Sequence, residues 1–244
     1  MTALKKENPS DQYDFNVKVD SDTTTDKMAD YLSRISNHEE LFKIGKGYLD
    51  EYKKGVKSFA FTSTGYKNSQ QRTILGLCCY FDYVDQYRIA IISDQLKYGV
   101  FDELLRDAED KTYQLGRWGD SVKYSSYHHN FDFIDYSELL RVYDDHLYSK
   151  TFDFEIKTIL DCYDIVLWDV PELEKMKLNL HFNYRISHFY ENLTMIVSPN
   201  ASSGKHVETI KKFFSNYNVN LSGILFETTS AIEQPKRKKF LGIV

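Results

Sequence analysis

The sequence predicts an α/β fold, in which a doubly wound, mostly parallel sheet follows a helical N-terminal extension. Four short runs, at 88–93, 163–169, 193–198 and 221–226, are almost continuously apolar, as in strands covered by helices on both faces. Segments with apolar residues three and four positions apart lie between these runs. Strands that alternate with helices form right-handed βαβ units, and such units build a parallel sheet.

The expected elements follow one another along most of the chain. Residues 22–54 have helical spacing, although Gly45 and Gly47 are expected to interrupt the helix. The other expected elements are strands at 58–62, 88–93, 129–134, 163–169, 193–198 and 221–226, and helices at 70–83, 99–107, within 135–161 and at 204–217.

Composition divides the chain into four parts. We expect a flexible arm at 1–24, a helical extension at 25–57, an α/β domain at 58–228 and a basic and apolar tail at 229–244. The 244 residues are enough to bury a sizeable core.

Charge and cysteine content favour a cytoplasmic protein that does not bind nucleic acid. The 31 Lys and Arg against 36 Asp and Glu give a net charge of −5, whereas a nucleic-acid binder needs a basic surface. Cys78, Cys79 and Cys162 lie in apolar runs and are expected to be core residues of a reduced protein. The sequence shows no signal peptide and no apolar run long enough to span a membrane.

Polar residues stand at the carboxyl ends of several expected strands. These ends are Thr62-Ser63, Ser93-Asp94-Gln95, Asp169-Val170-Pro171 and Ser198-Pro199-Asn200. Ligands of doubly wound sheets bind at this edge, so we expect any functional site there.

The order of these strand ends resembles that of ParA/MinD-like P-loop ATPases, and in particular the bacterial tyrosine kinases of capsule and exopolysaccharide export. The most specific stretch, Tyr163-Asp-Ile-Val-Leu-Trp-Asp-Val-Pro171, is similar to the family pattern of Tyr-Asp-x, three apolar residues and Asp-x-Pro. Thr62-Ser63, Ser93–Lys97 and Gly223–Glu227 match further motifs in the family's order. The resemblance covers about residues 57–227 and implies a P-loop NTPase-like fold.

The departures from the family fall on the phosphate-binding loop. In the register set by Thr62-Ser63, the loop glycines are replaced by Lys67 and Ser69. Gln70 stands at the position of the catalytic lysine, and Gln71 at that of the hydroxyl that binds Mg²⁺. Glutamine has no positive charge for a triphosphate, and non-glycine residues disfavour the left-handed backbone of such a loop. We therefore interpret the stretch as a degenerate Walker A motif.

The acidic motifs are also reduced. Asp94 is one residue out of register with the family's second-strand motif and is expected to point to the opposite face. Glu227 stands in place of the base-contacting Asn, and Asp169 alone keeps its position. We expect no catalytic residue and no cofactor. A vestigial nucleotide site would be lined by Lys67, Gln70, Asp94 and Asp169.

The resemblance therefore implies a catalytically inactive pseudo-ATPase. It would act by protein contacts, as a regulatory or scaffolding protein of a cell-surface or spatially localised bacterial process. Its partner would be an active paralogous ATPase, a membrane-protein complex or a second copy of itself.

Two alternatives stay open. The first is a divergent active ATPase or tyrosine kinase that binds ATP with Mg²⁺ through Lys67 and Asp169, with residues 65–69 as a shortened loop. The second is a receiver-like signalling domain, with Asp169 as the phosphate acceptor and Ser198 as the switch hydroxyl. The acid pair that receivers carry on their first strand is missing, which disfavours this second alternative.

Two further features have weaker implications. The tail places a basic cluster before apolar residues, which suits weak contact with an anionic membrane surface, docking to a partner, or a solubilising role. These tail residues are Lys236, Arg237, Lys238, Lys239, Phe240 and Leu241. The histidines, among them His128, His129, His181 and His188, lack the spacing of a metal site, and no metal is expected.

Overall fold

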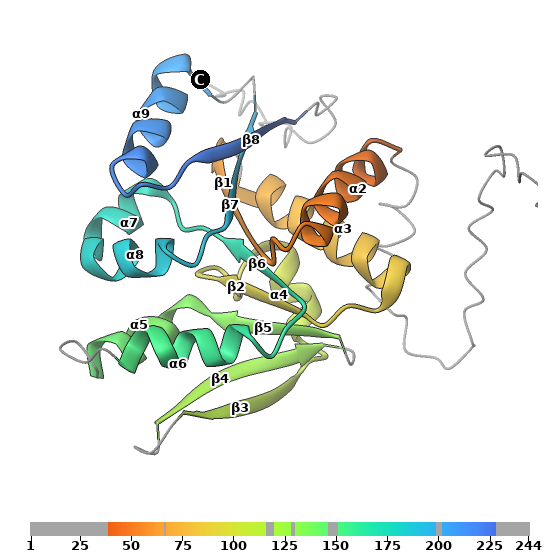
Figure 1. Ribbon diagram of the computed structural model, residues 1–244, viewed down its shortest axis with the longest axis vertical. Helices are drawn as coiled ribbons and strands as arrows, with labels where there is room; N and C mark the ends of the chain where they lie inside the picture. The colour runs from red at the N-terminus through yellow and green to blue at the C-terminus, as the bar shows by residue number, and fades with distance from the viewer. Residues whose placement is uncertain are drawn as a thin grey trace, which may run out of the picture.

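A computed structural model describes residues 39–65, 67–115, 120–127, 130–145, 151–198 and 202–227. Figure 1 shows one sheet with helices packed on its two faces. The expected arm at 1–24 and the tail at 229–244 lie outside the described residues.

The sheet has eight strands in the order β3-β4-β5-β2-β6-β1-β7-β8. The strands are β1 (Ser58–Thr64), β2 (Ile89–Ser93), β3 (Glu109–Leu115), β4 (Asp120–Tyr127), β5 (Phe131–Asp135), β6 (Ile165–Asp169), β7 (Asn192–Val197) and β8 (Leu221–Phe226). The helices are α2 (Glu39–Lys53), α3 (Lys67–Asp85), α4 (Gly99–Leu105), α5 (Tyr136–Asp145), α6 (Thr151–Leu160), α7 (Leu173–Leu178), α8 (Leu180–Ser187) and α9 (Gly204–Ser215).

Strands β5, β2, β6, β1, β7 and β8 run parallel to one another, which confirms the expected mostly parallel sheet. Strands β3 and β4 add an antiparallel ribbon at one side. Neither this ribbon nor α7 and α8 was expected from the sequence.

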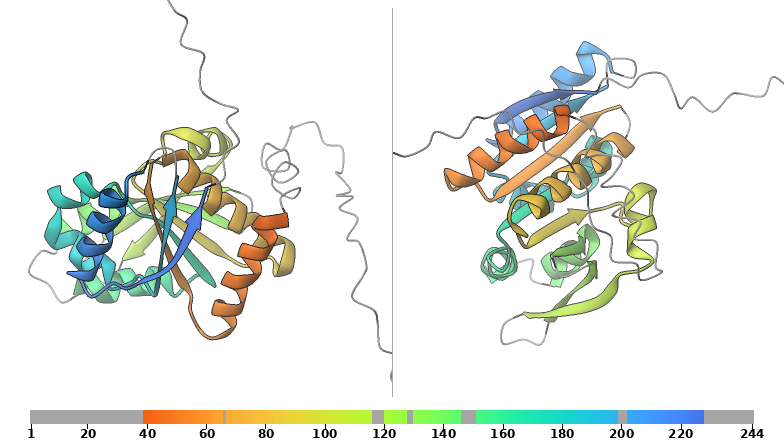
Figure 2. Two further views of the ribbon diagram at one scale, coloured as in Figure 1. Left: turned by 90° about the horizontal axis from the view of Figure 1, so that it is seen from above. Right: turned by 90° about the vertical axis from the view of Figure 1, so that its right-hand side faces the viewer.

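Helices cover both faces, which confirms the doubly wound architecture. Alternate residues of the central strands enter two separate apolar clusters, since side chains along a strand point to opposite faces. Phe59 and Phe61 of β1 join the cluster beneath α2, α3 and α4, whereas Ala60 joins the cluster beneath α5 to α9. Figure 2 shows the helices on the two faces of the sheet from above and from the side.

Helix α2 runs without interruption through Gly45 and Gly47, so the expected break was wrong. Gly45 is buried, and a Cβ atom built on it would lie 2.5 Å from Cγ of Tyr80. The missing side chain therefore lets α2 approach α3 closely.

The cysteines follow the sequence expectation only in part. Cys78 and Cys79 are buried in α3, but Cys162 is exposed, which corrects its assignment to the core. It lies in the turn after α6, where its thiol donates a hydrogen bond to the carbonyl of Thr158. Within the described ranges, no helix is long and apolar enough to cross a membrane.

Candidate functional site

The candidate site lies where the chain connections leave the centre of the sheet in opposite directions. Strands β6 and β1 are neighbours in the sheet. The connection from β1 through α3 leads to β2, on the far side of β6, and the connection from β6 through α7 and α8 leads to β7, on the far side of β1. The carboxyl ends of β1 and β6 therefore form a topological switch point, where sheets of this kind bind ligands. Asp169 ends β6, and Lys67 begins α3 after the short connection from β1.

The side chain of Lys67 is mostly buried and pairs with groups of the protein itself. Its Nζ atom lies 2.9 Å from Oδ1 of Asp169 and donates a hydrogen bond of 2.7 Å to the carbonyl of Val170. Only 12 % of its side chain is exposed. The first residue of α3 is thus tied to the last residue of β6 and the one that follows it.

Asp169 is fully buried on the side of the sheet that α3 covers. It pairs in register with Ser93 of β2, whose hydroxyl donates a 2.5 Å hydrogen bond to Oδ2 of Asp169. Burial raises the pKa of Asp169 above its ordinary value, because the charged form loses its water, while Lys67 and Ser93 act in the opposite direction.

Asp94 belongs to the same cluster, so the expectation that it would point to the opposite face was wrong. Its Oδ2 accepts a 2.7 Å hydrogen bond from Nζ of Lys175 in α7, and its Oδ1 lies 4.0 Å from Nζ of Lys67. Strand β2 ends at Ser93, so the alternation of side chains no longer applies one residue later. Two carboxylates and two ammonium groups therefore face one another.

Gln70 and Gln71 fix the surrounding backbone. The amide nitrogen of Gln70 donates to the carbonyls of Phe61 and Val170, at 2.5 and 3.1 Å. That of Gln71 donates to the carbonyls of Gln95 and Tyr98, both at 3.3 Å. Gln70 thus lies beside Lys67 and Asp169, as the sequence predicted, but its side chain holds strand ends together.

A carboxylate of the chain itself lies against the first turn of α3. Glu227, directly after β8, accepts a 2.5 Å hydrogen bond from the hydroxyl of Ser69 and another from the hydroxyl of Ser198. A helix N-terminus attracts negative charge, because its first N–H groups lack partners within the helix. Sequence reasoning assigned Glu227 to the base-contacting position and missed this contact.

The connection between β1 and α3 is shorter than a phosphate-binding loop. Only two residues, Gly65 and Tyr66, separate Thr64 at the end of β1 from Lys67 at the start of α3. A phosphate-binding loop instead needs a run of free backbone N–H groups ahead of the helix. Lys67 and Ser69 lie in the first turn of α3, not in the shortened loop of the alternative reading, and Tyr66 lies outside the described residues.

The geometry does not favour a receiver domain either. A phosphate acceptor has to be reached by the phosphate donor, whereas Asp169 has no exposed surface. The hydroxyl of Ser198 donates its hydrogen bond to Glu227.

Two further kinds of group could take part in such a site, namely clusters that bind a metal ion and histidines. In the part of the chain that the structure describes, no group of three or more His, Cys, Asp or Glu side chains could hold a metal ion. His181 and His188 are exposed on and directly after α8, and His128 and His129 fall outside the described residues.

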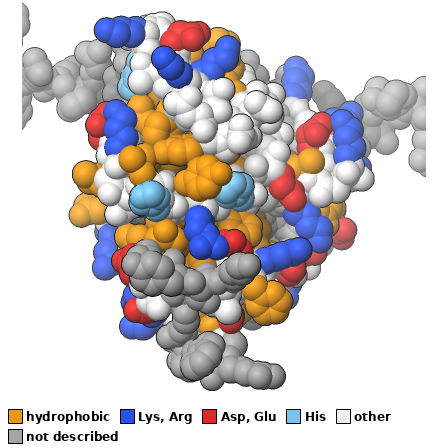
Figure 3. Space-filling model, turned by 60° about the vertical axis from the view of Figure 1, so that its left-hand side comes forward, with side chains coloured by type: hydrophobic (Ala, Val, Ile, Leu, Met, Phe, Trp, Pro, Cys, Tyr) orange, Lys and Arg blue, Asp and Glu red, His pale blue; other side chains and the backbone are white. Residues whose placement is uncertain are grey.

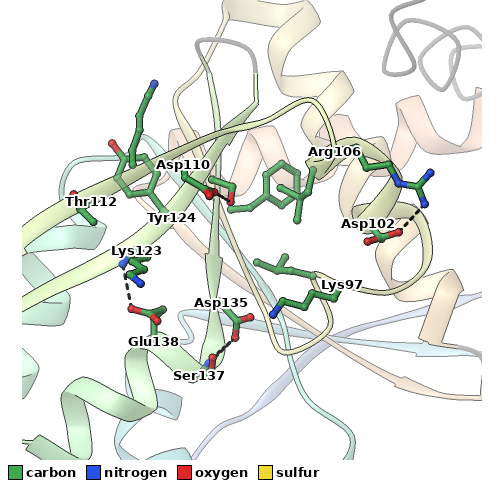
Figure 4. A pocket seen from close by; sticks show the side chains of 15 residues that line it. Lys97, Asp102, Arg106, Asp110, Thr112, Lys123, Tyr124, Asp135, Ser137 and Glu138 are labelled. Carbon is green, nitrogen blue, oxygen red and sulfur yellow. Dashed lines mark hydrogen bonds and ion pairs between the residues drawn. The ribbon is translucent and has the colours of Figure 1, made fainter.

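A separate pocket of about 590 Å³ lies beside this centre, between α4, the ribbon of β3 and β4, and the end of β5. Figure 4 shows its lining, in which Lys97 and Lys123 stand among the carboxylates of Asp102, Asp135 and Glu138. Asp135 and Glu138 already accept hydrogen bonds from Ser137 and from the backbone of Lys123. Neither Lys67 nor Asp169 lines this pocket.

No family model matches the chain, and no curated protein matches it. Among solved structures, the kinase domain of VpsO has a TM-score of 0.54 and 13 % identity, with 84 % of this chain and 98 % of that chain covered. The chimerical protein CapA2B2 has a TM-score of 0.49 and 15 % identity, covering 72 % and 77 %. The kinase domain of Escherichia coli tyrosine kinase ETK has a TM-score of 0.47 and 13 % identity, covering 73 % and 71 %.

The likeness to VpsO covers most of both chains and shows that this protein has the α/β fold of a bacterial tyrosine kinase domain. The α/β fold that the strand ends predicted is therefore confirmed.

Proposed function

We propose that this protein is a catalytically inactive relative of the P-loop kinases and acts by binding other proteins. The observation that carries the proposal is the ion pair between Lys67 and Asp169. It places an ammonium group of the chain itself on the one acid that keeps the family's position.

The charges around the site support the same conclusion. In an active enzyme of this design, the acids at the strand ends act on a metal-bound triphosphate, and the loop amides and lysine bind its phosphates. Here Lys67 and Lys175 neutralise Asp169 and Asp94, and Glu227 lies at the first turn of α3. Lysines of the chain thus take the place of the metal ion at the two acids, and Glu227 takes the place of the phosphate at α3.

A role in protein binding is supported by exposed apolar side chains on α6, α7 and α8. Phe154 is 69 % exposed and Leu178 is 81 % exposed, and Leu180 and Tyr184 lie on α8 with exposed side chains. Figure 3 shows hydrophobic side chains gathered on this side of the molecule. Apolar side chains grouped at a surface mark contacts with other proteins. The partner we propose is an active paralogous ATPase or a membrane-protein complex.

Turnover of ATP tests this proposal directly. The full chain, incubated with ATP and Mg²⁺, should release no phosphate above the background of the buffer. Mass spectrometry should find no phosphate on its tyrosines. Asp169→Asn is the matched variant, because it removes the one acid in the family's position while keeping the shape of the side chain. Phosphate release that Asp169→Asn abolishes would contradict the proposal.

One observation favours the alternative of a divergent active enzyme. Lys67, Asp94 and Asp169 come together at the switch point, where a nucleotide would bind. In that alternative, nucleotide binding has to separate Lys67 from Asp169 before the acid can act. Turnover lost in both Lys67→Met and Asp169→Asn would establish it.

A further inference from the structure

The two edges of the described sheet differ sharply in charge. Strand β3 forms one edge and β8 the other (Figure 1). Strand β3 begins with Glu109, Asp110 and Lys111, all exposed, whereas β8 has the sequence Leu-Ser-Gly-Ile-Leu-Phe without a charged residue. Charges on an edge strand prevent it from pairing with other chains, so β3 is protected and β8 is not.

Strand β8 also carries an exposed apolar stripe. Ile224 is 45 % exposed and Phe226 is 67 % exposed, and they share a face because they are two residues apart. They pair in register with Met195 and Val197 of β7, both of which are buried in the cluster beneath α5 to α9. The stripe therefore continues onto β8, the last strand of the sheet, the face that is buried on β7.

We propose that a second copy of this chain pairs with β8 in antiparallel orientation, so that the sheet continues from one subunit into the other. A two-fold axis at Leu225 would place Ile224 opposite Phe226 of the partner subunit. Residues directly opposite in an antiparallel pair point to the same face, so the two exposed stripes would cover each other. The strand is thus complementary to itself and brings no like charges together.

The size of the strand limits the strength of this contact. Six residues with two exposed apolar side chains in each copy make a small interface, and small interfaces are weak and transient. We therefore expect a reversible dimer that dissociates on dilution in the micromolar range, about −8 kcal/mol of association free energy. This contact does not involve Lys67 or Asp169, so it does not depend on whether the site binds nucleotide.

Sedimentation velocity of the full chain over a range of concentrations tests the proposal. The wild-type chain should shift from monomer to dimer, and Ile224→Lys and Phe226→Lys should each remain monomeric. Val84→Lys near the end of α3 is the matched control, because its side chain is 41 % exposed, close to the 45 % of Ile224, and lies on a helix rather than on β8. It should dimerise like the wild type. A wild-type chain that stays monomeric throughout, or a dimer that survives Phe226→Lys, would overturn the proposal.

Hydrogen exchange distinguishes a second copy from the chain's own segment after residue 227. If a second copy covers β8, the amides of 221–226 should become better protected as the protein is concentrated. Protection that is the same in dilute and concentrated samples would show that no second copy covers the strand, and the proposal would fail; strong protection in both would mean that another part of the same chain covers it.

Discussion

The amino group of Lys67 lies 2.9 Å from Oδ1 of Asp169, a carboxylate with no exposed surface. The pair joins the start of α3 to the end of β6. Removing one partner of a buried pair leaves the other charge without compensation, which costs more than the intact pair contributes. The pair should therefore matter for the stability of the fold, whatever it does to the binding of ligands.

Lys67→Met should destabilise the protein by about 3 kcal/mol, because Asp169 would remain buried without its counter-charge. Urea unfolding of the variant and the wild type at neutral pH measures this difference. The double variant Lys67→Met with Asp169→Asn should recover at least half of the loss, since no charge is then left buried. Equal stability of wild type and Lys67→Met would show that the two residues are not paired in solution.

Gly45→Ala should destabilise the protein by about 1–3 kcal/mol, because the new methyl group would collide with the ring of Tyr80. Gly47→Ala is the control on the same helix, since nothing lies within 4 Å of a Cβ atom there. It should stabilise the protein by up to about 1 kcal/mol through helix propensity. Thermal unfolding of both variants measures the difference, and the opposite order of stabilities would contradict the packing of α2 on α3.

Gly99→Ala should also destabilise the protein, by about 1–3 kcal/mol. Gly99 begins α4 with φ +66°, a left-handed conformation, and a Cβ atom there would overlap Oε1 of Gln71. Gly204, which begins α9, has open space around it, so Gly204→Ala should change the unfolding free energy by less than half as much. Chemical denaturation of the two variants compares them, and equal losses would place the Gln71 side chain elsewhere.

Stability should fall at alkaline pH through Tyr48, whose hydroxyl lies 2.6 Å from Oγ1 of Thr194. Burial raises the pKa of Tyr48 from 10.0 to about 12, although the contact with Thr194 lowers it. Between these values the folded state keeps a proton that the unfolded chain loses. The contribution is therefore complete below about pH 10 and is lost as the pH rises to about 12, by up to about 2–3 kcal/mol.

Tyr48→Phe tests this dependence. The variant should be about 1 kcal/mol less stable at neutral pH, because a hydrogen bond is lost, and its stability should fall less steeply above about pH 10. Burial also raises the pKa of Tyr113 to about 12, so part of the slope should remain. Urea unfolding at about pH 8 and about pH 11 measures both effects. An unchanged slope in the variant would contradict the burial of the Tyr48 hydroxyl.

The central strands could be predicted because their sequences carry one dominant signal. Residues 88–93 and 163–169 are apolar on both faces, and only a strand covered by two layers of helices needs that pattern. Strands β3 and β4 were missed for the opposite reason. Their exposed positions hold polar and charged residues, and their buried residues, such as Leu115 and Val122, are too few to show a clear alternation.

The candidate site could be located from the sequence, but its internal contacts could not. Strand ends at 62–63, 93–95 and 169–171 indicated the correct edge of the sheet. Asp94 was placed on the wrong face because the end of β2, one residue before it, is not visible in the sequence. The pairings of Lys175 with Asp94 and of Ser69 with Glu227 join residues far apart in the chain, and no local pattern encodes them. That these residues form a vestigial nucleotide site stays a prediction.

The measurement that tests the central claim most directly is calorimetric titration of the full chain with ATP and with ADP, each with and without Mg²⁺. If Lys67 and Lys175 stay paired with Asp169 and Asp94, and Glu227 stays at the start of α3, no heat of binding should appear at nucleotide concentrations up to the millimolar range. Micromolar binding that requires Mg²⁺ and is lost in Asp169→Asn would contradict the account, and would show that the Lys67–Asp169 pair opens to admit a nucleotide.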